Sequence, residues 1–129
     1  MVLLDTHVLV WTIADPDKLS KRAREAIREA RSESSVAIAD FTLWELAWLL
    51  EHHRIRVWGT LESFVREATE QVAVKPITPE IAAIAVRLPA TFPRDPGDRL
   101  IASTAISYGV PLITADEQIR KSATVSTLW

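Results

Sequence analysis

The stretch from residue 91 to residue 116 constrains the fold more than any other part of the chain. Residues 95–98 (DPGD) predict a helix start, because an aspartate precedes a proline at the first helical position and a second aspartate lies in the first turn. Gly109 predicts the end of that helix, and the apolar residues 110–113 predict a buried strand. Asp116 comes just after this strand. The unit therefore places one carboxylate at a helix N-terminus and another beyond the carboxyl end of a strand, where open α/β sheets bind ligands.

The rest of the chain alternates short apolar runs with longer segments of helical character. The apolar runs predict strands at 2–4, 36–39, 72–75 and 110–113, with a weak last strand at 124–126. The longer segments predict helices at 6–14, 19–32, 41–53, 60–70, 79–88, 96–108 and 117–121. This alternation is typical of an α/β fold in which a central, mostly parallel sheet of four to five strands carries helices on both faces.

Length and composition narrow the possible functions. With 129 residues the chain has the size of one domain with one core, so we expect residues 1–129 to form a single domain. The net charge of −2 gives no overall attraction for polyanions. Cysteine is absent, which excludes disulfides, thiolate catalysis and the usual structural zinc sites. Neither a signal peptide nor an apolar run of membrane-spanning length is visible, so we expect a cytoplasmic protein without membrane contact.

Four acidic side chains are expected near the carboxyl ends of the strands: Asp5, Glu45, Asp98 and Asp116. Taken singly, each could be an ordinary helix cap, and residues 42–45 have the spacing of a capping box. Glu45 is harder to explain in this way. It is the only charged residue in an otherwise apolar helix, 41–50, that we expect to be buried or to lie in an interface. A carboxylate in such a helix needs a cationic partner.

Convergence of these carboxylates would favour a metal ion. If the first strand lies between the second and the fourth, all four acids reach one crevice, where they repel one another and raise one another's pKa values. A hard divalent cation removes this conflict. Mg²⁺, with Mn²⁺ as a possible substitute, suits a site made of oxygen ligands and is a usual requirement of phosphoryl chemistry.

Four segments carry a family resemblance: residues 2–9 (VLLDTHVL), 42–45 (TLWE), 94–102 (RDPGDRLIA) and 112–116 (LITAD). They closely resemble the PIN-domain nucleases and, more narrowly, the VapC-type toxins of toxin–antitoxin pairs. The resemblance covers nearly the whole chain. It implies a PIN-like three-layer sandwich, metal-dependent cleavage of RNA by an endoribonuclease, a homodimer, and inhibition by a cognate antitoxin.

The resemblance also implies roles for particular residues. Asp5, Glu45 and Asp98 match the core metal-binding and catalytic acids of the family, and Asp116 matches a fourth, more variable acid. Four neighbouring residues are candidates for accessory roles: Thr6, Asp95, Arg99 and Thr114. The acids would hold Mg²⁺ and orient a water molecule for attack on the phosphodiester, which leaves a 5′-phosphate and a 3′-hydroxyl.

Two departures from the family pattern are visible. Gly97 stands where relatives often carry an aromatic residue, so we expect a looser helix start. Leu49 stands where many relatives have a lysine, which removes a possible phosphate contact.

The surfaces that would contact RNA or a protein partner are less defined. The basic side of the helix at 18–31 could follow a phosphate backbone, but acidic residues are interleaved with the basic ones, so an ordinary solvated face is the favoured interpretation. For most of Trp11, Trp44, Trp48 and Trp58 we expect core packing, with the antitoxin groove or the dimer contact as the alternative.

Other functions fit less well. A receiver-type phosphoacceptor domain needs an aspartate after the third strand, where this chain has Lys75 and Pro76, and a haloacid-type phosphatase needs a second acid at position 7, which is histidine. The more serious alternative is a non-catalytic, metal-binding PIN-fold interaction module that acts through its partner. It predicts Mg²⁺ binding without cleavage of RNA.

Overall fold

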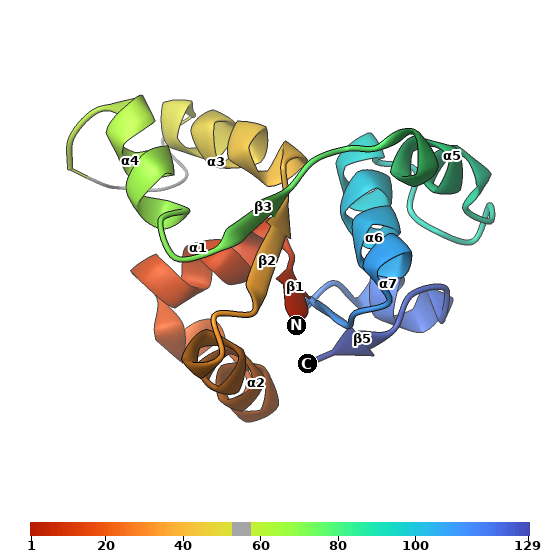
Figure 1. Cartoon of the computed structure of the whole chain (residues 1–129), viewed down its shortest axis with the longest axis horizontal. Coiled ribbons are helices and arrows are strands. Elements are labelled where there is room, and N and C mark those ends of the chain that lie inside the picture. The colour runs from red at the N-terminus through yellow and green to blue at the C-terminus, as the bar shows by residue number, and fades with distance from the viewer. Residues whose placement is uncertain (53–57) are drawn as a thin grey trace.

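The computed structural model describes residues 1–52 and 58–129 (Figure 1). The strands are β1 (Val2–Leu4), β2 (Val36–Ala39), β3 (Ala73–Lys75), β4 (Leu112–Ile113) and β5 (Thr127–Leu128). The helices are α1 (Thr6–Ala14), α2 (Lys21–Ser32), α3 (Phe41–Glu51), α4 (Leu61–Ala68), α5 (Pro79–Arg87), α6 (Pro96–Tyr108) and α7 (Glu117–Ser122), and a 3-10 turn, η1 (Pro16–Lys18), precedes α2. The predicted end of α3 at His53 lies outside the described residues.

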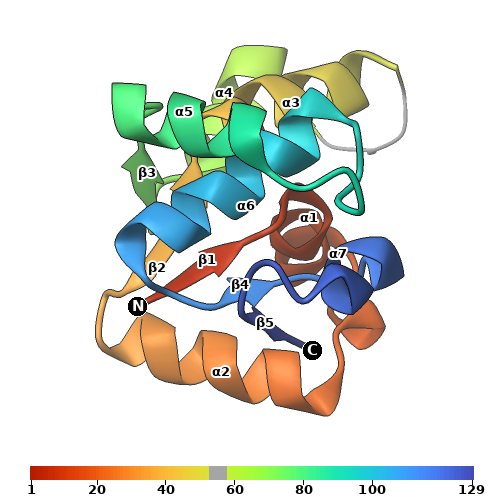
Figure 2. The same ribbon diagram turned by 90° about the vertical axis from the view of Figure 1, so that its right-hand side faces the viewer.

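The strands form one parallel sheet with β1 at its centre, in the order β3-β2-β1-β4-β5. Leu3 in β1 pairs with Ala37 in β2 and with Leu112 in β4. Side chains of successive strand residues point to opposite faces. Val2 and Leu4 therefore belong to the core under α1, α2, α3 and α4, whereas Leu3 belongs to the core under α5, α6 and α7. Figures 1 and 2 show the resulting three layers, which confirm the predicted fold class.

The segment around α6 folds as its sequence predicts. The Asp95 side chain accepts a hydrogen bond from the Gly97 amide at 3.0 Å, and Pro96 is the first helical residue. Gly109 ends the helix with a φ of 63°, in the left-handed region that glycine adopts without strain. The end of β4 then brings Asp116 to the carboxyl edge of the sheet.

Several local expectations were wrong because packing overrides local patterns. The last strand lies at 127–128 instead of 124–126. The capping box proposed at 42–45 does not exist, because α3 begins at Phe41 and Thr42 already lies inside the helix, with no side-chain cap at Asp40. Core packing is confirmed for Trp11, which packs against the core, but is wrong for Trp44, Trp48 and Trp58, which are 58%, 39% and 99% exposed.

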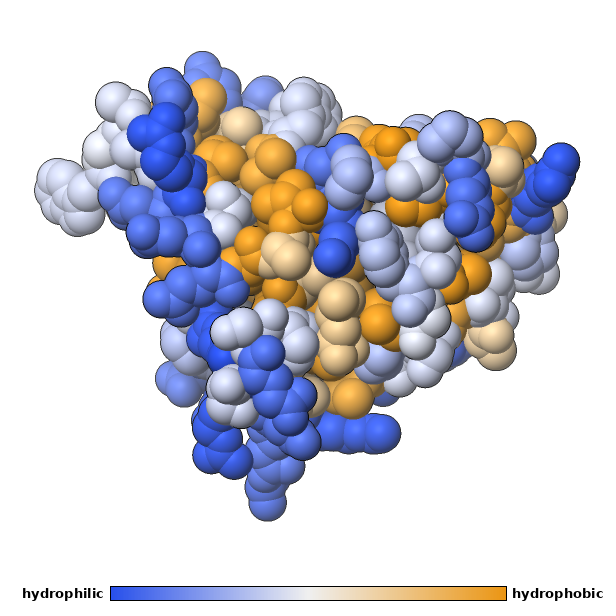
Figure 3. All heavy atoms as spheres, viewed as in Figure 1, coloured by the Kyte–Doolittle hydropathy of each residue, from blue (hydrophilic) through white to orange (hydrophobic). Residues whose placement is uncertain are grey.

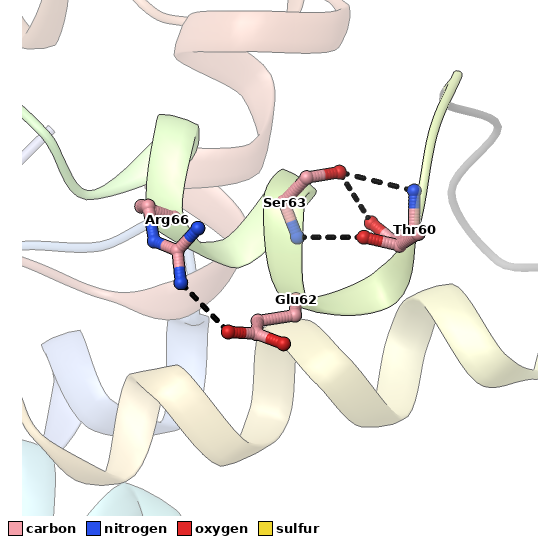
Figure 4. Close-up of polar contacts among 4 residues, drawn as sticks. All are labelled: Thr60, Glu62, Ser63 and Arg66. Atoms are coloured by element: carbon pink, nitrogen blue, oxygen red, sulfur yellow. Dashed lines mark hydrogen bonds and ion pairs between the residues drawn. The ribbon is translucent and has the colours of Figure 1, made fainter.

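Helix α4 is secured at its start by its own side chains (Figure 4). The Thr60 hydroxyl accepts a hydrogen bond from the Ser63 amide at 3.1 Å, and the Ser63 hydroxyl accepts one from the Thr60 amide at 3.0 Å. One turn later Arg66 pairs with Glu62 at 2.6 Å, and both side chains are largely exposed. The hydroxyls satisfy N–H groups that a helix start leaves unpaired, so this short helix keeps a defined first turn.

Arg99 of α6 holds the connection between α5 and α6. Its guanidinium donates hydrogen bonds to four backbone carbonyls, those of Ala85, Leu88, Phe92 and Pro93, at 3.0 to 3.5 Å. Carbonyls at the end of α5 would otherwise lack partners. The guanidinium therefore fixes the loop that leads into Asp95 and Asp98. Among the described residues no helix has both the length and the apolar character needed to cross a membrane.

We expect the Arg99→Met substitution to lower the free energy of unfolding by about 2–3 kcal/mol, because half-buried carbonyls would lose a charged donor. Arg66→Met is the matched control. It removes an exposed ion pair and should cost less than about 1 kcal/mol. Urea denaturation of both variants measures the difference, and equal losses would show that Arg99 does not hold the loop.

Candidate active site

Asp5 lies at the centre of the carboxyl edge of the sheet, directly after β1. Its side chain is 9% exposed. One carboxylate oxygen accepts a hydrogen bond from the Thr114 hydroxyl at 2.7 Å, and the other accepts one from the Thr6 amide, also at 2.7 Å. The Thr114 hydroxyl in turn accepts a hydrogen bond from the Asp116 amide at 3.1 Å. Asp5 is therefore held by the first residue of α1 and by the residue that follows β4.

Glu45 reaches the same edge from α3. Its Oε1 accepts a hydrogen bond from the Thr6 hydroxyl at 2.6 Å, and that hydroxyl lies 3.1 Å from the hydroxyl of the buried Thr42. Thr42 was not recognised as part of this site. The available signal was a threonine in an apolar helix three residues before Glu45, but this spacing also fits a capping box.

Gly97 lets the start of α6 approach α3 closely. A Cβ atom at this position would lie 2.7 Å from Cε1 of Phe41 and 3.4 Å from Oε2 of Glu45. The glycine therefore packs against the glutamate helix, whereas a looser helix start was expected. This close approach brings Asp98, in the first turn of α6, toward Glu45.

Asp116 and Asp95 both cap helices. Asp116 accepts hydrogen bonds from the amides of Gln118 and Ile119 at 2.8 and 3.1 Å, at the start of α7. Asp95 caps α6 in the same way, as expected. Their charges nevertheless act on the other acids, as the pKa of Asp98 shows.

Burial and mutual repulsion raise the pKa values of the central acids. Burial, followed by repulsion from Asp95, Asp5, Asp116 and Glu45, raises the pKa of Asp98 to about 7. Burial is also the largest cause of the raised pKa values of Asp5 and Glu45, which the hydrogen bonds from Thr114 and Thr6 oppose. The structure thus brings the four predicted acids, and Asp95, close enough to repel one another.

The donor chemistry of this cluster fits a hard divalent cation. The acids are oxygen donors whose negative charges destabilise one another, and such a cation would relieve the repulsion. Within residues 1–52 and 58–129, however, no three acidic or imidazole groups already surround one point at metal-binding distance. Hydroxyl and amide donors bind several of the carboxylate oxygens instead. Among these described residues the cluster therefore offers oxygen donors but no closed coordination shell.

Two other residues near the acids have defined positions. Arg99 directs its guanidinium to the loop carbonyls, so its observed contacts are structural. His7 is exposed, with its ring 6.3 Å from that of Trp11, and its charge lowers the pKa values of Asp5 and Glu45.

Comparison with known proteins identifies the family. Residues 2–124 match the PIN domain. The chain belongs to the PIN-domain family. It is 44% identical over 119 residues to Ribonuclease VapC22 of Mycobacterium tuberculosis. The aligned segment covers 92% of this chain and 89% of that protein. The VapC-type resemblance read from the four acidic segments is thereby confirmed.

Solved structures share the fold of this PIN domain. The chain superposes on VapBC2 from Rickettsia felis bound to a promoter DNA fragment, with a TM-score of 0.75 at 16% identity, over 98% of this chain and 97% of that one. DNA-bound VapBC from Salmonella typhimurium superposes with a TM-score of 0.72 at 20% identity, over 98% of this chain and 95% of that one. A toxin-antitoxin complex from Klebsiella pneumoniae superposes with a TM-score of 0.61 at 23% identity, over 90% of this chain and 87% of that one. At these identities the likeness shows the fold.

The raised pKa of Asp98 predicts that ionisation of this group destabilises the metal-free PIN domain. The folded value of about 7 lies above the ordinary value of 3.8. The folded state then binds the proton more tightly, so stability falls as pH rises between these values and levels off above about 7. Urea denaturation at pH 5, 6, 7 and 8 in EDTA should show a steeper decline for the wild type than for Asp98→Asn. Asp17→Asn, on η1, should behave as the wild type, and identical slopes in all three proteins would contradict this prediction.

Proposed function

We propose that this protein is a metal-dependent endoribonuclease, the toxin of a toxin–antitoxin pair. The observation that carries the proposal is the cluster of Asp5, Glu45, Asp98 and Asp116 at the carboxyl edge of the sheet, where burial and repulsion raise the pKa values of the first three. Membership of the PIN-domain family supports it, as does the 44% identity to a protein named Ribonuclease VapC22. An isolated acidic cluster has many uses, but this cluster in a VapC-type chain favours hydrolysis of RNA.

In this proposal Asp5, Glu45 and Asp98 hold Mg²⁺, or Mn²⁺ as a substitute, and Asp116 contributes directly or through water. The ion would lower the pKa of a bound water molecule and stabilise the charge that develops on the phosphate. Asp98 must lose its proton before it can serve as a ligand, and its pKa of about 7 makes this step sensitive to pH near neutrality.

Thr6 and Thr114 would orient the carboxylates. Thr114 binds one oxygen of Asp5, and Thr6 binds Oε1 of Glu45, which leaves Oε2 on the side of Gly97 and α6. Each hydroxyl fixes a carboxylate rotamer before a cation arrives. This preorganisation reduces the entropy lost when a site closes around an ion.

We further propose that a cognate antitoxin covers an apolar groove between α3 and α4. The groove has a volume of about 500 Å³ and is lined by Leu43, Ala47, Leu61 and Val65, together with the largely exposed ion pair of Glu62 and Arg66. Trp44 of α3 lies beside Leu43 in the sequence and is 58% exposed. Figure 3 shows hydrophobic residues beside α4 and over β3, whereas α4 itself presents mostly hydrophilic residues on the face that is drawn. An exposed apolar surface of this kind is typical of an interface, and a related fold is solved as a toxin-antitoxin complex.

A homodimer is also part of the proposal. Three apolar side chains on or beside β3 and α5 are exposed, namely Val74 at 38%, Ile77 at 42% and Val86 at 83%. A second copy of the chain would remove this surface from water.

RNA cleavage should depend on both the acids and the metal. Wild-type protein free of antitoxin should cut single-stranded or structured RNA with Mg²⁺ or Mn²⁺ and stop in EDTA. Asp5→Asn, Glu45→Gln and Asp98→Asn should each lose at least about 100-fold in rate while remaining folded. Asp17→Asn, an exposed acid outside the cluster, should retain full activity. Folded wild type that binds Mg²⁺ but cuts no RNA across a broad panel would favour the interaction module instead.

The groove between α3 and α4 predicts a separation of cleavage from inhibition. Ala47→Glu places a charge in the apolar groove, so this variant should cleave RNA normally but resist inhibition by an equimolar amount of the cognate antitoxin. Ala14→Glu, at the exposed end of α1 and outside both proposed protein contacts, is the matched control and should be inhibited like the wild type. Normal inhibition of Ala47→Glu would place the antitoxin elsewhere.

A further inference from the structure

A second hollow lies beside the acidic cluster, between the loop that precedes α6 and helix α7. Its volume is about 540 Å³, and its lining includes Phe92, Pro93, Arg94, Gln118 and Lys121. Figure 2 shows the α5–α6 connection and α7 on the same side of the molecule, next to the start of α1.

Both walls of this hollow continue into the acidic cluster. On one wall Arg94 is followed directly by the capping residue Asp95. On the other, the amide of Gln118 donates a hydrogen bond to Asp116 at 2.8 Å. The hollow therefore adjoins the acidic cluster on both of its walls.

Arg94 and Lys121 place two positive charges in this hollow, next to the acidic cluster. Arg94 is exposed, and in the described part of the chain it has no ion-pair partner. Lys121 lies 3.5 Å from Glu117, but both side chains are more than three-quarters exposed, so water competes with this pair. The acids and the net charge of −2 repel a polyanion such as RNA, and these two cations would attract its phosphates.

The backbone of two residues that line the hollow, Phe92 and Pro93, is held in place. Phe92 is buried, and the carbonyls of Phe92 and Pro93 accept hydrogen bonds from the Arg99 guanidinium. The Gln118 side chain belongs to the opposite wall and offers both donors and an acceptor. Cations, the partly exposed ring of Pro93 and an amide are groups that can contact the phosphate, the face and the edge of an unpaired nucleotide.

We propose that this hollow binds a nucleotide that flanks the scissile phosphodiester. Arg94 and Lys121 contact its phosphates, the base lies against Pro93, and the amide of Gln118 hydrogen-bonds to the base edge. The inference rests on the proposed RNase function and extends it to substrate recognition. The two cations set affinity for the strand, whereas Gln118 sets a base preference at one position beside the cut.

The test compares two double variants that remove the same charges. Arg94→Gln/Lys121→Gln acts on the hollow, and Arg66→Gln/Arg87→Gln acts on exposed positions of α4 and α5, outside both candidate RNA surfaces. With Mg²⁺ and a single-stranded RNA oligonucleotide, the first should raise KM about two- to fivefold for each cation lost and change kcat less than about twofold. Arg94→Lys/Lys121→Arg keeps both charges and should restore KM. Equal effects of the two glutamine pairs would attribute the change to net charge and overturn the proposal.

Binding measured without cleavage separates failure of this inference from failure of the proposed function. In an Asp98→Asn background, the slope of log Kd against log salt for a fluorescent RNA octamer should fall by about 1.4 when both hollow cations are removed, or about 0.7 for each phosphate contact. Absence of cleavage by the wild type would refute the proposed nuclease activity, whereas an unchanged salt slope would refute nucleotide binding in the hollow.

Two further measurements test the kind of ligand. Gln118→Ala should change the preferred base at one position flanking the cut and leave the salt slope unchanged. Hexaglutamate should compete with the octamer much more weakly than an RNA hexamer does. Equal competition would mean that the hollow binds acidic peptides and would overturn the assignment to RNA.

Discussion

The rest of the candidate site depends on the carboxylate of Asp5, buried at the end of the central strand. A buried carboxylate is costly unless its oxygens are hydrogen-bonded. Thr114 after β4 and the amide of Thr6 at the start of α1 supply these bonds at 2.7 Å each. The Thr6 hydroxyl then binds Glu45 from α3. One buried charge thus ties two strands and two helices into a single edge, and the same bonds give its carboxylate a fixed orientation.

The close approach of α6 to α3 completes this arrangement. Gly97 leaves no space for a side chain beneath Phe41 and Glu45, so the first turn of α6 comes near the glutamate and brings Asp98 with it. Arg99, one residue later, points the other way and binds the carbonyls of the preceding loop. Adjacent residues in the first turn of α6 therefore have different roles. Asp98 adds a negative charge to the acidic cluster, whereas Arg99 holds the loop that leads into α6.

The apolar composition of α3 has a related meaning. Thr42 and Leu46 are buried, yet Trp44 and Trp48 project from the helix and are more than a third exposed. Such a helix has more apolar surface than the fold of one chain covers. The groove against α4 and the hollow beside α7 differ in chemistry, since the first is mainly apolar and the second combines cations with polar and apolar side chains. A protein helix suits the former and a nucleic-acid strand the latter.

The sequence by itself determined the alternation of strands and helices, the Asp95 and Gly109 ends of α6, and which acids could meet at the sheet edge. These features follow from local signals, namely residue periodicity, capping chemistry and the rule that parallel strands share a carboxyl edge. The central position of β1, on which that meeting depends, came from the tertiary structure. Only the tertiary structure decided that Thr42 supports Thr6 instead of capping a helix, that Arg99 faces carbonyls, and that three tryptophans remain exposed. Those outcomes depend on how separate elements pack against one another, and the spacing of residues along a sequence does not encode which surface a neighbouring element will cover.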